Sequence, residues 1–272
     1  MQGVLYVSHG SRVEEATIEA ISCIRAAHQH VGTSLWEICF LELTDPTVQQ
    51  GMERLVQQGA TSIIIVPVLL LSAGHYFKDL PHEVEGFKKQ YPNVTFRYAK
   101  PLGVQERIID VLVERIEEVR SEPETNIDVL LVGRGSRYPE TKRDIEAIAH
   151  KLKKKLNGAE TEVSYLAAAS PTFEEGLSTT LTKQGSQTIV VPYLWFTGKL
   201  IGSMQKKIND LREKNVDIKL CGYLNNHPNM VLALSDRVNE VLQKPAGSDI
   251  EHTFDTRTKK GGGYVEYYPY NG

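Results

Sequence analysis

Short runs of aliphatic and β-branched residues alternate along the chain with longer stretches in which apolar positions recur at helical spacing. This alternation predicts βαβ units, and therefore a parallel sheet with helices on both faces. The segment 62–71 is almost continuously apolar, as is typical of a central strand that is buried on both faces. In the first half we expect strands at 4–8, 37–41, 62–71 and 95–99, and helices at 14–30, 47–58, 78–90 and 105–120.

The first predicted helix carries two further expectations. Its isoleucines Ile18, Ile21 and Ile24 are expected to share one side of the helix. His28 and His30 lie two residues apart at its end, so their side chains diverge on a helix and are expected at the surface.

The second half of the chain repeats the first at an offset of 125 residues, so that residues 4–12 match residues 129–137. Ordered matches continue over two further segments, which chance does not readily produce. We therefore expect two homologous doubly wound α/β domains with central parallel sheets, at 1–122 and 126–244, followed by a disordered tail at 245–272. The same offset pairs Glu37 with Glu162, Leu41 with Leu166, Pro46 with Pro171, Thr47 with Thr172, Gly51 with Gly176 and Pro67 with Pro192.

Composition excludes several classes of protein. The chain has 31 Lys and Arg against 34 Asp and Glu, a net charge of −3, which gives no footprint for nucleic acid or for an anionic membrane surface. No apolar run approaches the roughly 18 residues of a membrane-spanning helix. The three cysteines lack CxxC spacing, which indicates a reducing compartment rather than a disulfide framework. We expect a cytoplasmic protein.

Candidate chemistry lies where predicted strands end. His9 directly follows the first strand, Glu42 follows the second, and His75 comes shortly after the third. Because ligands of parallel α/β sheets bind at the carboxyl ends of the strands, these groups are expected at one edge of one sheet. Two imidazoles and a carboxylate suit a divalent transition metal.

The repeat gives an independent test of this interpretation. The scaffold positions agree between the halves, whereas all three candidate groups differ, so the first half is expected to carry the chemistry. The equivalent residues of the second half are Arg134, Ala167 and Leu200, or Lys199 if the gap near Ala73 is shifted.

Taken singly, each candidate also has a structural interpretation. Histidines at strand ends are more often structural than catalytic, and Glu42 can cap the helix that follows it. A phosphoester enzyme is a further alternative, because Gly10-Ser11 and Gly135-Ser136 can bind an anion through main-chain N–H groups. Ser8 counts against it, since a second phosphate-binding arginine is missing before His9.

Five segments together resemble a known family. They are His-Gly-Ser-Arg at 9–12, Phe-Leu-Glu at 40–42 followed by Asp-Pro-Thr at 45–47, and the run 67–76 followed by Asp-Leu-Pro at 79–81. This combination resembles the type II tetrapyrrole chelatases, and among them the long, two-domain sirohydrochlorin ferrochelatases and cobaltochelatases of bacilli and their relatives.

The resemblance implies two chelatase-like domains with an active-site cleft between them, and ATP-independent insertion of Fe²⁺ or Co²⁺ into sirohydrochlorin. It implies His9 and His75 as metal ligands and proton acceptors, with Glu42 as the acidic catalytic helper. No tightly bound cofactor is expected, and the chain is expected to be a monomer with internal pseudo-twofold symmetry. Leu70, Leu71, Ser72, Ala73 and Gly74 map onto the loop that borders the macrocycle, and Arg12, Lys78, Arg134, Arg137, Lys199 and Lys206 are candidates for binding its carboxylates.

The leading hypothesis is therefore a sirohydrochlorin ferrochelatase of siroheme synthesis. Sirohydrochlorin cobaltochelatase in cobalamin synthesis is the nearest alternative, because the same ligands serve both metals. A non-catalytic carrier of metal or tetrapyrrole that uses the same site is the third.

Overall fold

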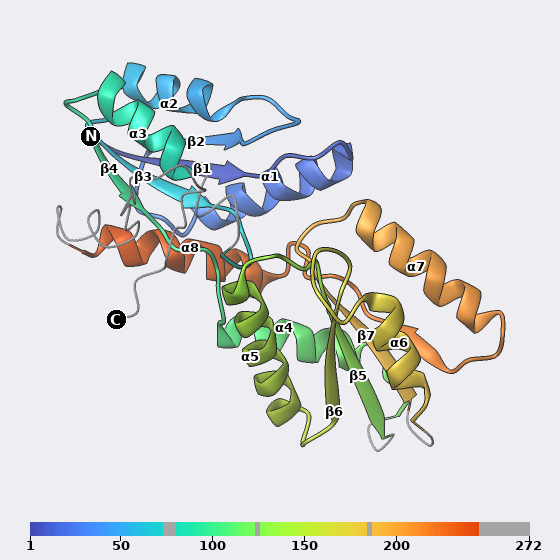
Figure 1. Cartoon of the computed structure of the whole chain (residues 1–272). Coiled ribbons are helices and arrows are strands. Elements are labelled where there is room, and N and C mark those ends of the chain that lie inside the picture. The colour runs from blue at the N-terminus through green and yellow to red at the C-terminus, as the bar shows by residue number, and fades with distance from the viewer. Residues whose placement is uncertain (73–79, 123–125, 184–186, 245–272) are drawn as a thin grey trace, which may run out of the picture. The chain divides into compact units, whose positions relative to one another are not determined.

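Two four-stranded parallel sheets form the framework of the protein in a computed structural model that describes residues 1–72, 80–122, 126–183 and 187–244 (Figure 1). The first sheet has the strand order β2-β1-β3-β4, and the second has the order β6-β5-β7-β8. The predicted α/β class is confirmed. The strands are β1 (Gln2–Ser8), β2 (Leu35–Phe40), β3 (Ser62–Pro67), β4 (Thr95–Tyr98), β5 (Ile127–Gly133), β6 (Glu160–Tyr165), β7 (Gln187–Tyr193) and β8 (Ile218–Leu220).

Helices connect the strands, as the alternating pattern predicts. The predicted helices of the first half agree with the observed ones to within about three residues at each end. The helices are α1 (Glu14–His28), α2 (Val48–Gln57), α3 (Leu80–Gln90), α4 (Glu106–Glu117), α5 (Pro139–Lys155), α6 (Phe173–Leu181), α7 (Lys199–Arg212) and α8 (Pro228–Leu242).

The chain forms two compact units that differ from the two sequence halves. Within the described residues, unit 1 comprises 1–10, 27–102 and the part of the chain from Leu234 onward, and unit 2 comprises 11–26 and 103–233. Helix α4, the last of the first half, therefore belongs to unit 2, where it packs against α5. The end of α8 belongs to unit 1, where the carbonyl oxygens of Val241 in the helix and of Lys244 just after it accept hydrogen bonds from the buried Arg97. The expected linker near 122–125 and the tail at 245–272 fall largely outside the described residues.

Each unit has a core between one face of its sheet and two helices. In unit 1, apolar residues of the strands pack against α2 and α3, which lie on the same side of the sheet (Figure 1). In unit 2, the corresponding face of the second sheet packs against α6 and α7 (Figure 1). Burial of these side chains is the main favourable contribution to folding, because each Å² of apolar surface removed from water contributes about 25 cal/mol.

The two halves repeat each other in local detail. The register of β1 with β2, in which Gly3 pairs with Leu35, recurs in β5 and β6, where Asp128 pairs with Glu160. Helices α2 and α6 each begin with a capping box, in which a threonine and the residue three positions on exchange hydrogen bonds. The capping boxes are Thr47 with Gln50 and Thr172 with Glu175.

Helix α1 differs from the expectation. Ile18 is 58% exposed, and the buried stripe comprises Ala16, Ala20, Cys23, Ile24 and Ala27. A spacing of three residues drifts around a helix of 3.6 residues per turn, so the three isoleucines cannot all face the core. The stripe instead follows the i, i+3, i+4 pattern.

The expectation for His28 is also wrong, whereas His30 is exposed as predicted. His28 is buried, stacks on Trp36 with ring centroids 4.4 Å apart, and accepts at Nδ1 from the hydroxyl of Tyr6 at 3.0 Å. Its Nε2 donates to the carbonyl oxygen of Thr33 at 2.9 Å. His28 extends the buried stripe, since it lies four residues after Ile24.

The apolar run at 62–71 is longer than the strand it contains. Strand β3 ends at Pro67, whose ring nitrogen cannot donate to a neighbouring strand. Val68 and Leu71 are nevertheless buried, because the loop after β3 packs into the protein. The apolar pattern correctly predicted burial in this segment, but the predicted strand is longer than the observed one.

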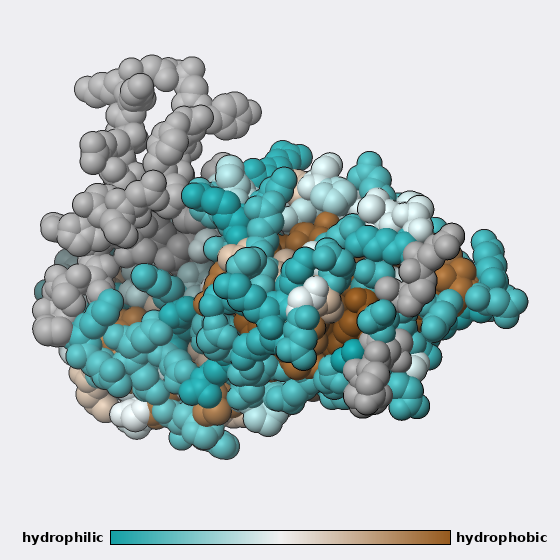
Figure 2. All heavy atoms as spheres, turned by 90° about the horizontal axis from the view of Figure 1, so that it is seen from below, coloured by the Kyte–Doolittle hydropathy of each residue, from teal (hydrophilic) through white to brown (hydrophobic). Residues whose placement is uncertain are grey.

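None of the helices in the described ranges is long and apolar enough to cross a membrane. Hydrophilic side chains cover most of the surface that Figure 2 displays, with smaller hydrophobic areas between them. Three large hydrophobic residues of the described chain are exposed, namely Met1, Ile18 and Leu43.

Candidate active site

The register of β1 and β2 brings His9 and Glu42 together at the carboxyl edge of the first sheet. Ser8 pairs with Phe40 in the parallel ladder, and main-chain hydrogen bonds continue beyond the strand ends. The N–H of Leu41 donates to the oxygen of Ser8, and the N–H of Glu42 donates to the oxygen of His9. The side chains then meet, with Nε2 of His9 3.3 Å from Oε1 of Glu42. The structure therefore supports the expectation that these two groups converge.

Gly10 allows this close approach of the two loops. Its φ is +90°, and a Cβ atom there would lie 1.8 Å from the carbonyl oxygen of Glu42. Any other residue would be strained by the left-handed backbone and would also push the Glu42 loop away. Glycine at this position is thus part of the geometry that holds His9 beside Glu42.

The contact of His9 with Gly10 indicates which of its ring nitrogens carries the hydrogen. Its Nδ1 lies 3.2 Å from the carbonyl oxygen of Gly10. Because a carbonyl oxygen only accepts, this contact requires hydrogen on Nδ1 and leaves the lone pair of a neutral imidazole on Nε2. That lone pair and the Glu42 carboxylate are electron-pair donors side by side. A proton or a metal cation between them would stabilise the arrangement.

The His9–Glu42 pair contributes little to the free energy of unfolding. The side chains of His9 and Glu42 are 35% and 53% exposed, and exposed ion pairs contribute at most about 1 kcal/mol. A chemical role explains a histidine and a glutamate at this edge better than a stabilising one.

The third candidate, His75, lies outside the described residues, as do Ala73, Gly74 and Lys78. Leu70, Leu71 and Ser72 follow the end of β3 in unit 1, where Leu71 is buried and the other two are half-buried. Among the described residues, no group of three or more His, Cys, Asp and Glu is arranged to hold a metal ion. The described part of the site thus supplies two candidate ligands.

Unit 2 repeats the main chain of this site with other side chains. Gly135 has φ +87°, and a Cβ atom there would lie 1.8 Å from the carbonyl oxygen of Ala167. The N–H of Ala167 donates to the oxygen of Arg134, as the N–H of Glu42 does to His9. Arg134 and Ala167 take the places of His9 and Glu42 and cannot form a histidine–carboxylate pair. Of these two equivalent places in the described chain, the one in unit 1 has the pair.

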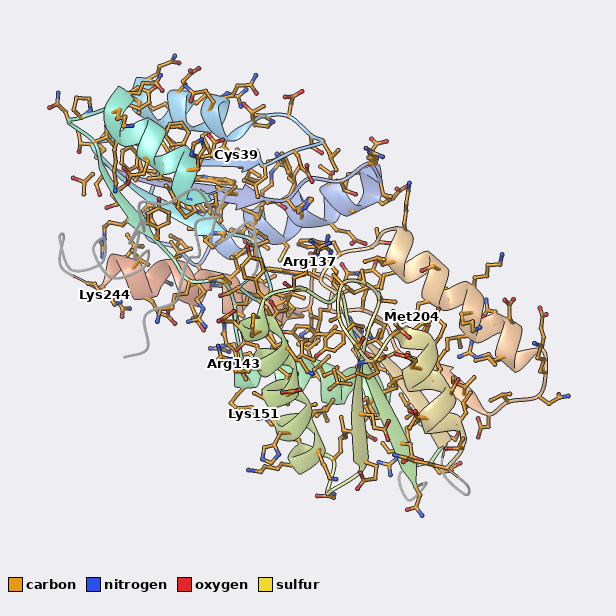
Figure 3. All side chains as sticks on the ribbon, in the orientation of Figure 1. Cys39, Arg137, Arg143, Lys151, Met204 and Lys244 are labelled. Carbon is orange, nitrogen blue, oxygen red and sulfur yellow. The ribbon has the colours of Figure 1, made fainter. Side chains whose placement is uncertain are left out.

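The candidate cations for substrate carboxylates that the structure describes lie in unit 2 and are exposed. Arg134 follows β5, Lys199 is the first residue of α7, and Arg12 precedes α1. Lys206 is exposed within α7, and Arg137, labelled in Figure 3, is exposed in the loop that leads from β5 into α5. Their exposure leaves them accessible to an anionic ligand.

One polar cluster in unit 2 was not foreseen from the sequence. The carboxylate of Glu19 accepts from the N–H of Thr197 at 2.8 Å and from the hydroxyl of Tyr223 at 2.6 Å. Burial and then this hydrogen bond to Glu19 raise the pKa of Tyr223. The cluster fixes the loop after β7, in which Trp195 and Phe196 stack with centroids 5.0 Å apart. No sequence signal links a helical glutamate to residues so distant along the chain.

Fold and site together define a duplicated, parallel α/β protein whose first half has a histidine–carboxylate pair at the carboxyl edge of its sheet. A family model described as CbiX matches residues 3–119 and again residues 128–241. The chain belongs to the CbiX family.

Relatives agree with this assignment over most of their lengths. The sirohydrochlorin ferrochelatase of Priestia megaterium is 43% identical over 242 residues, which cover 89% of this chain and 91% of the relative. The sirohydrochlorin cobaltochelatase of the same organism is 33% identical over 249 residues, covering 89% and 81%. The solved structure of SirB from Bacillus subtilis with Fe³⁺ has a TM-score of 0.82 and 37% identity, covering 88% of this chain and 94% of SirB.

Proposed function

We propose that this protein is a metal chelatase that inserts Fe²⁺ into sirohydrochlorin to form siroheme without ATP. The observation that carries this function is the His9–Glu42 pair, with its atoms 3.3 Å apart at the carboxyl edge of the first sheet. It occurs in a chain that is 43% identical to a sirohydrochlorin ferrochelatase.

Metal insertion requires groups that hold a divalent cation briefly and groups that accept the two pyrrole protons. The Nε2 lone pair of His9 and the carboxylate of Glu42 can serve both purposes. His75, which follows β3 in the sequence, is proposed as the second imidazole ligand. An open site of three ligands releases its metal more readily than a closed site of four. Partial exposure of the pair suits this transfer, because the metal must leave for the macrocycle.

Contacts with the tetrapyrrole are proposed for two sets of residues. Leu70, Leu71, Ser72, Ala73 and Gly74 follow β3 and would border the macrocycle. Arg12, Arg134 and Lys199 are exposed cations of unit 2 that would pair with the carboxylates of sirohydrochlorin. A net charge of −3 is compatible with an anionic substrate, because local cations determine the field at a binding site.

Cobalt is the second candidate metal, because a sirohydrochlorin cobaltochelatase is 33% identical over most of this chain. Histidine and carboxylate ligands bind Fe²⁺ and Co²⁺ alike, so ligand type does not separate them. Metallation of sirohydrochlorin by Fe²⁺ and by Co²⁺, measured in parallel by absorbance, gives the ratio of kcat/KM for the two metals. We expect Fe²⁺ to be preferred, and a clear preference for Co²⁺ would assign the protein to cobalamin synthesis.

The same assay separates an enzyme from a carrier. A chelatase accelerates metallation above the uncatalysed rate, whereas a carrier binds sirohydrochlorin without acceleration. His9→Ala and His75→Ala should each abolish acceleration while circular dichroism shows an unchanged fold. Full activity in the double variant would contradict the proposed function.

Location and assembly complete the proposal. We propose a cytoplasmic monomer with internal pseudo-twofold symmetry. Three free, buried cysteines and the use of Fe²⁺, which oxidising conditions convert to Fe³⁺, support a reducing compartment. The two matches of one family model in a single chain support the internal repeat.

A further inference from the structure

Leu43, the residue after Glu42, combines two unfavourable properties. Its φ is +66°, which places a bulky side chain in the left-handed region that glycine, asparagine and aspartate favour. Its side chain is also 50% exposed, one of three large hydrophobic residues of the described chain that are exposed. Folding gains little from a leucine here.

Both halves of the chain have the positive φ at this position, whereas the leucine side chain occurs in the first half. Ala168 holds the equivalent place in the second half and also has a positive φ, +55°. The two loops are built alike. A Cβ atom on Gly10 would lie 1.8 Å from the carbonyl oxygen of Glu42, and a Cβ atom on Gly135 would lie 1.8 Å from that of Ala167. A small residue therefore satisfies this turn in unit 2, and the larger apolar side chain distinguishes the half that has the His9–Glu42 pair.

The position of Leu43 relates it to the chemistry of that pair. Its chain neighbour Glu42 donates a main-chain hydrogen bond to His9, so Leu43 extends the loop that forms the carboxyl edge of the first sheet. The other two exposed hydrophobic residues of the described chain belong to other elements. Met1 is at the amino end of β1, where its amino group bonds to Thr61, and Ile18 is on α1.

We infer that Leu43 is a substrate-contact residue that packs on the apolar face of the tetrapyrrole macrocycle beside the metal-transfer pair. This inference rests on the proposed function, which supplies the ligand. A tetrapyrrole has broad apolar faces and a rim of carboxylates, so an exposed leucine that directly follows Glu42 can bury its surface when the macrocycle binds. The strain and exposure of Leu43 in the free protein are then offset by substrate binding.

The contact involves no reacting atom. A side chain that packs on a face of the macrocycle stabilises the bound substrate and the transition state equally, so its loss raises KM and leaves kcat unchanged. A residue that acted by positioning Glu42 would instead lower kcat. The two roles therefore differ in a measurable way.

Three variants test the contact without depending on a damaged fold. Leu43→Gly and Leu43→Asn both suit a positive φ and remove the apolar contact, so they should unfold at or above the wild-type temperature. We expect the KM for sirohydrochlorin, and its Kd measured by fluorescence without metal, to rise about tenfold in both. The KM for Fe²⁺ and kcat should stay near wild type. Leu43→Met keeps an apolar side chain of similar size and should retain the wild-type KM.

Ala168→Gly is the matched control, because it relieves the same backbone conformation in unit 2 without removing a large apolar side chain. It should leave the KM for sirohydrochlorin unchanged. Unchanged KM and Kd in Leu43→Gly and Leu43→Asn, or a fall in kcat alone, would overturn the inference while wild-type metallation upheld the proposed function. If the wild type failed to metallate sirohydrochlorin, the proposed function would fail, and the fluorescence titration would still decide whether Leu43 contacts the macrocycle.

Discussion

The carbonyl oxygen of Glu42 occupies the space beside Gly10 so closely that a Cβ atom on Gly10 would lie 1.8 Å from it. The two loops that carry His9 and Glu42 are thus in contact through their main chains, which sets the distance between the side chains. Glycine is required by the close approach and also by the φ of +90°. The same relationship recurs between Gly135 and Ala167, where no histidine–carboxylate pair depends on it.

Gly10→Ala should therefore separate His9 from Glu42. We expect the free energy of unfolding to fall by about 3 kcal/mol, because alanine is strained at this φ and the Glu42 loop must move. Chemical denaturation measures this loss, and kcat for metallation should fall at least tenfold in the protein that remains folded.

Gly135→Ala is the matched variant for this prediction. It should cost a similar free energy of unfolding, since its clash with Ala167 is the same. Its kcat should stay near the wild-type value. Equal losses of kcat in the two variants would mean that Gly10 acts through stability alone.

Glu42→Gln tests the carboxylate with almost no change in shape. Because the pair is exposed, the free energy of unfolding should change by less than about 0.5 kcal/mol. Metallation should fall by at least a factor of about 100, because an amide neither accepts a pyrrole proton nor balances the charge of Fe²⁺. Initial rates of siroheme formation measure this effect.

A second histidine–glutamate pair provides the control for Glu42→Gln. In unit 2, Nε2 of His227 donates to Oε2 of Glu114 at 2.8 Å, while its Nδ1 accepts from the N–H of Asn229 at the start of α8. Glu114→Gln should leave metallation unchanged. If both glutamine variants lost activity equally, the specific role of Glu42 would be contradicted.

Much of this arrangement follows from the sequence because burial and periodicity are local signals. The buried strand that begins at Ser62 and the helices between the strands could be predicted, because the spacing of apolar residues indicates which faces of an element are buried. The convergence of His9 with Glu42 followed from one topological rule, since parallel strands end at the same edge of a sheet. The repeat then predicted that the first half carries the chemistry.

The remaining features depend on contacts between distant residues or on backbone angles. The positive φ of Leu43 has no signature in a leucine, and Glu19 meets Thr197 and Tyr223 only after folding. His28 was expected at the surface because it diverges from His30 on a helix, whereas the structure buries it and Tyr6 and Thr33 satisfy both of its ring nitrogens. The placement of α4 in unit 2 and of the end of α8 in unit 1 is invisible to any local pattern.

The burial of His28 gives the stability of the protein a specific pH dependence. Burial lowers the pKa of His28, and the hydrogen bond to Thr33 opposes this effect in part. An unfolded histidine titrates near its ordinary pKa of about 6.5, so below that pH the unfolded state binds more protons than the folded state. The contribution of neutral His28 is complete above about pH 6.5 and is lost as the pH falls toward its folded pKa. Urea unfolding between pH 5 and 8 measures this dependence.

His28→Gln should flatten that dependence, because glutamine can donate to Thr33 and accept from Tyr6 without titrating. His30→Gln changes an exposed histidine of the same segment and should leave the dependence as in the wild type. A wild-type slope in His28→Gln would show that other groups cause the acid sensitivity.

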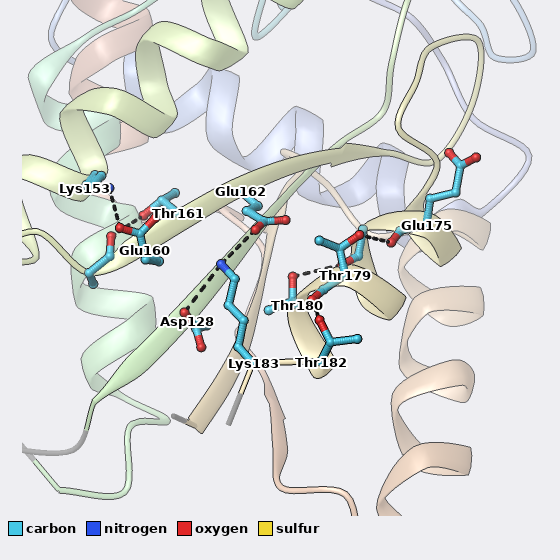
Figure 4. A network of polar contacts seen from close by, with 12 residues as sticks. Asp128, Lys153, Glu160, Thr161, Glu162, Glu175, Thr179, Thr180, Thr182 and Lys183 are labelled. Carbon is cyan, nitrogen blue, oxygen red and sulfur yellow. Dashed lines mark hydrogen bonds and ion pairs between the residues drawn. The ribbon is translucent and has the colours of Figure 1, made fainter. Parts of the chain in front are cut away.

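Lys183 should stabilise unit 2 by neutralising a buried carboxylate. Its Nζ lies 2.8 Å from Oε1 of Glu162 and 3.7 Å from Oδ1 of Asp128, whose side chain is only 6% exposed (Figure 4). Lys183→Met keeps most of the aliphatic stem and leaves two carboxylates without their shared cation, so the free energy of unfolding should fall by about 2 kcal/mol. In unit 1 the residues equivalent to Lys183, Glu162 and Asp128 are Gln58, Glu37 and Gly3. Gln58 donates a hydrogen bond to Glu37, and Gly3 has no carboxylate. Gln58→Met should therefore cost less than about 0.5 kcal/mol in the same urea titration, and equal losses in the two variants would mean that Asp128 does not need Lys183.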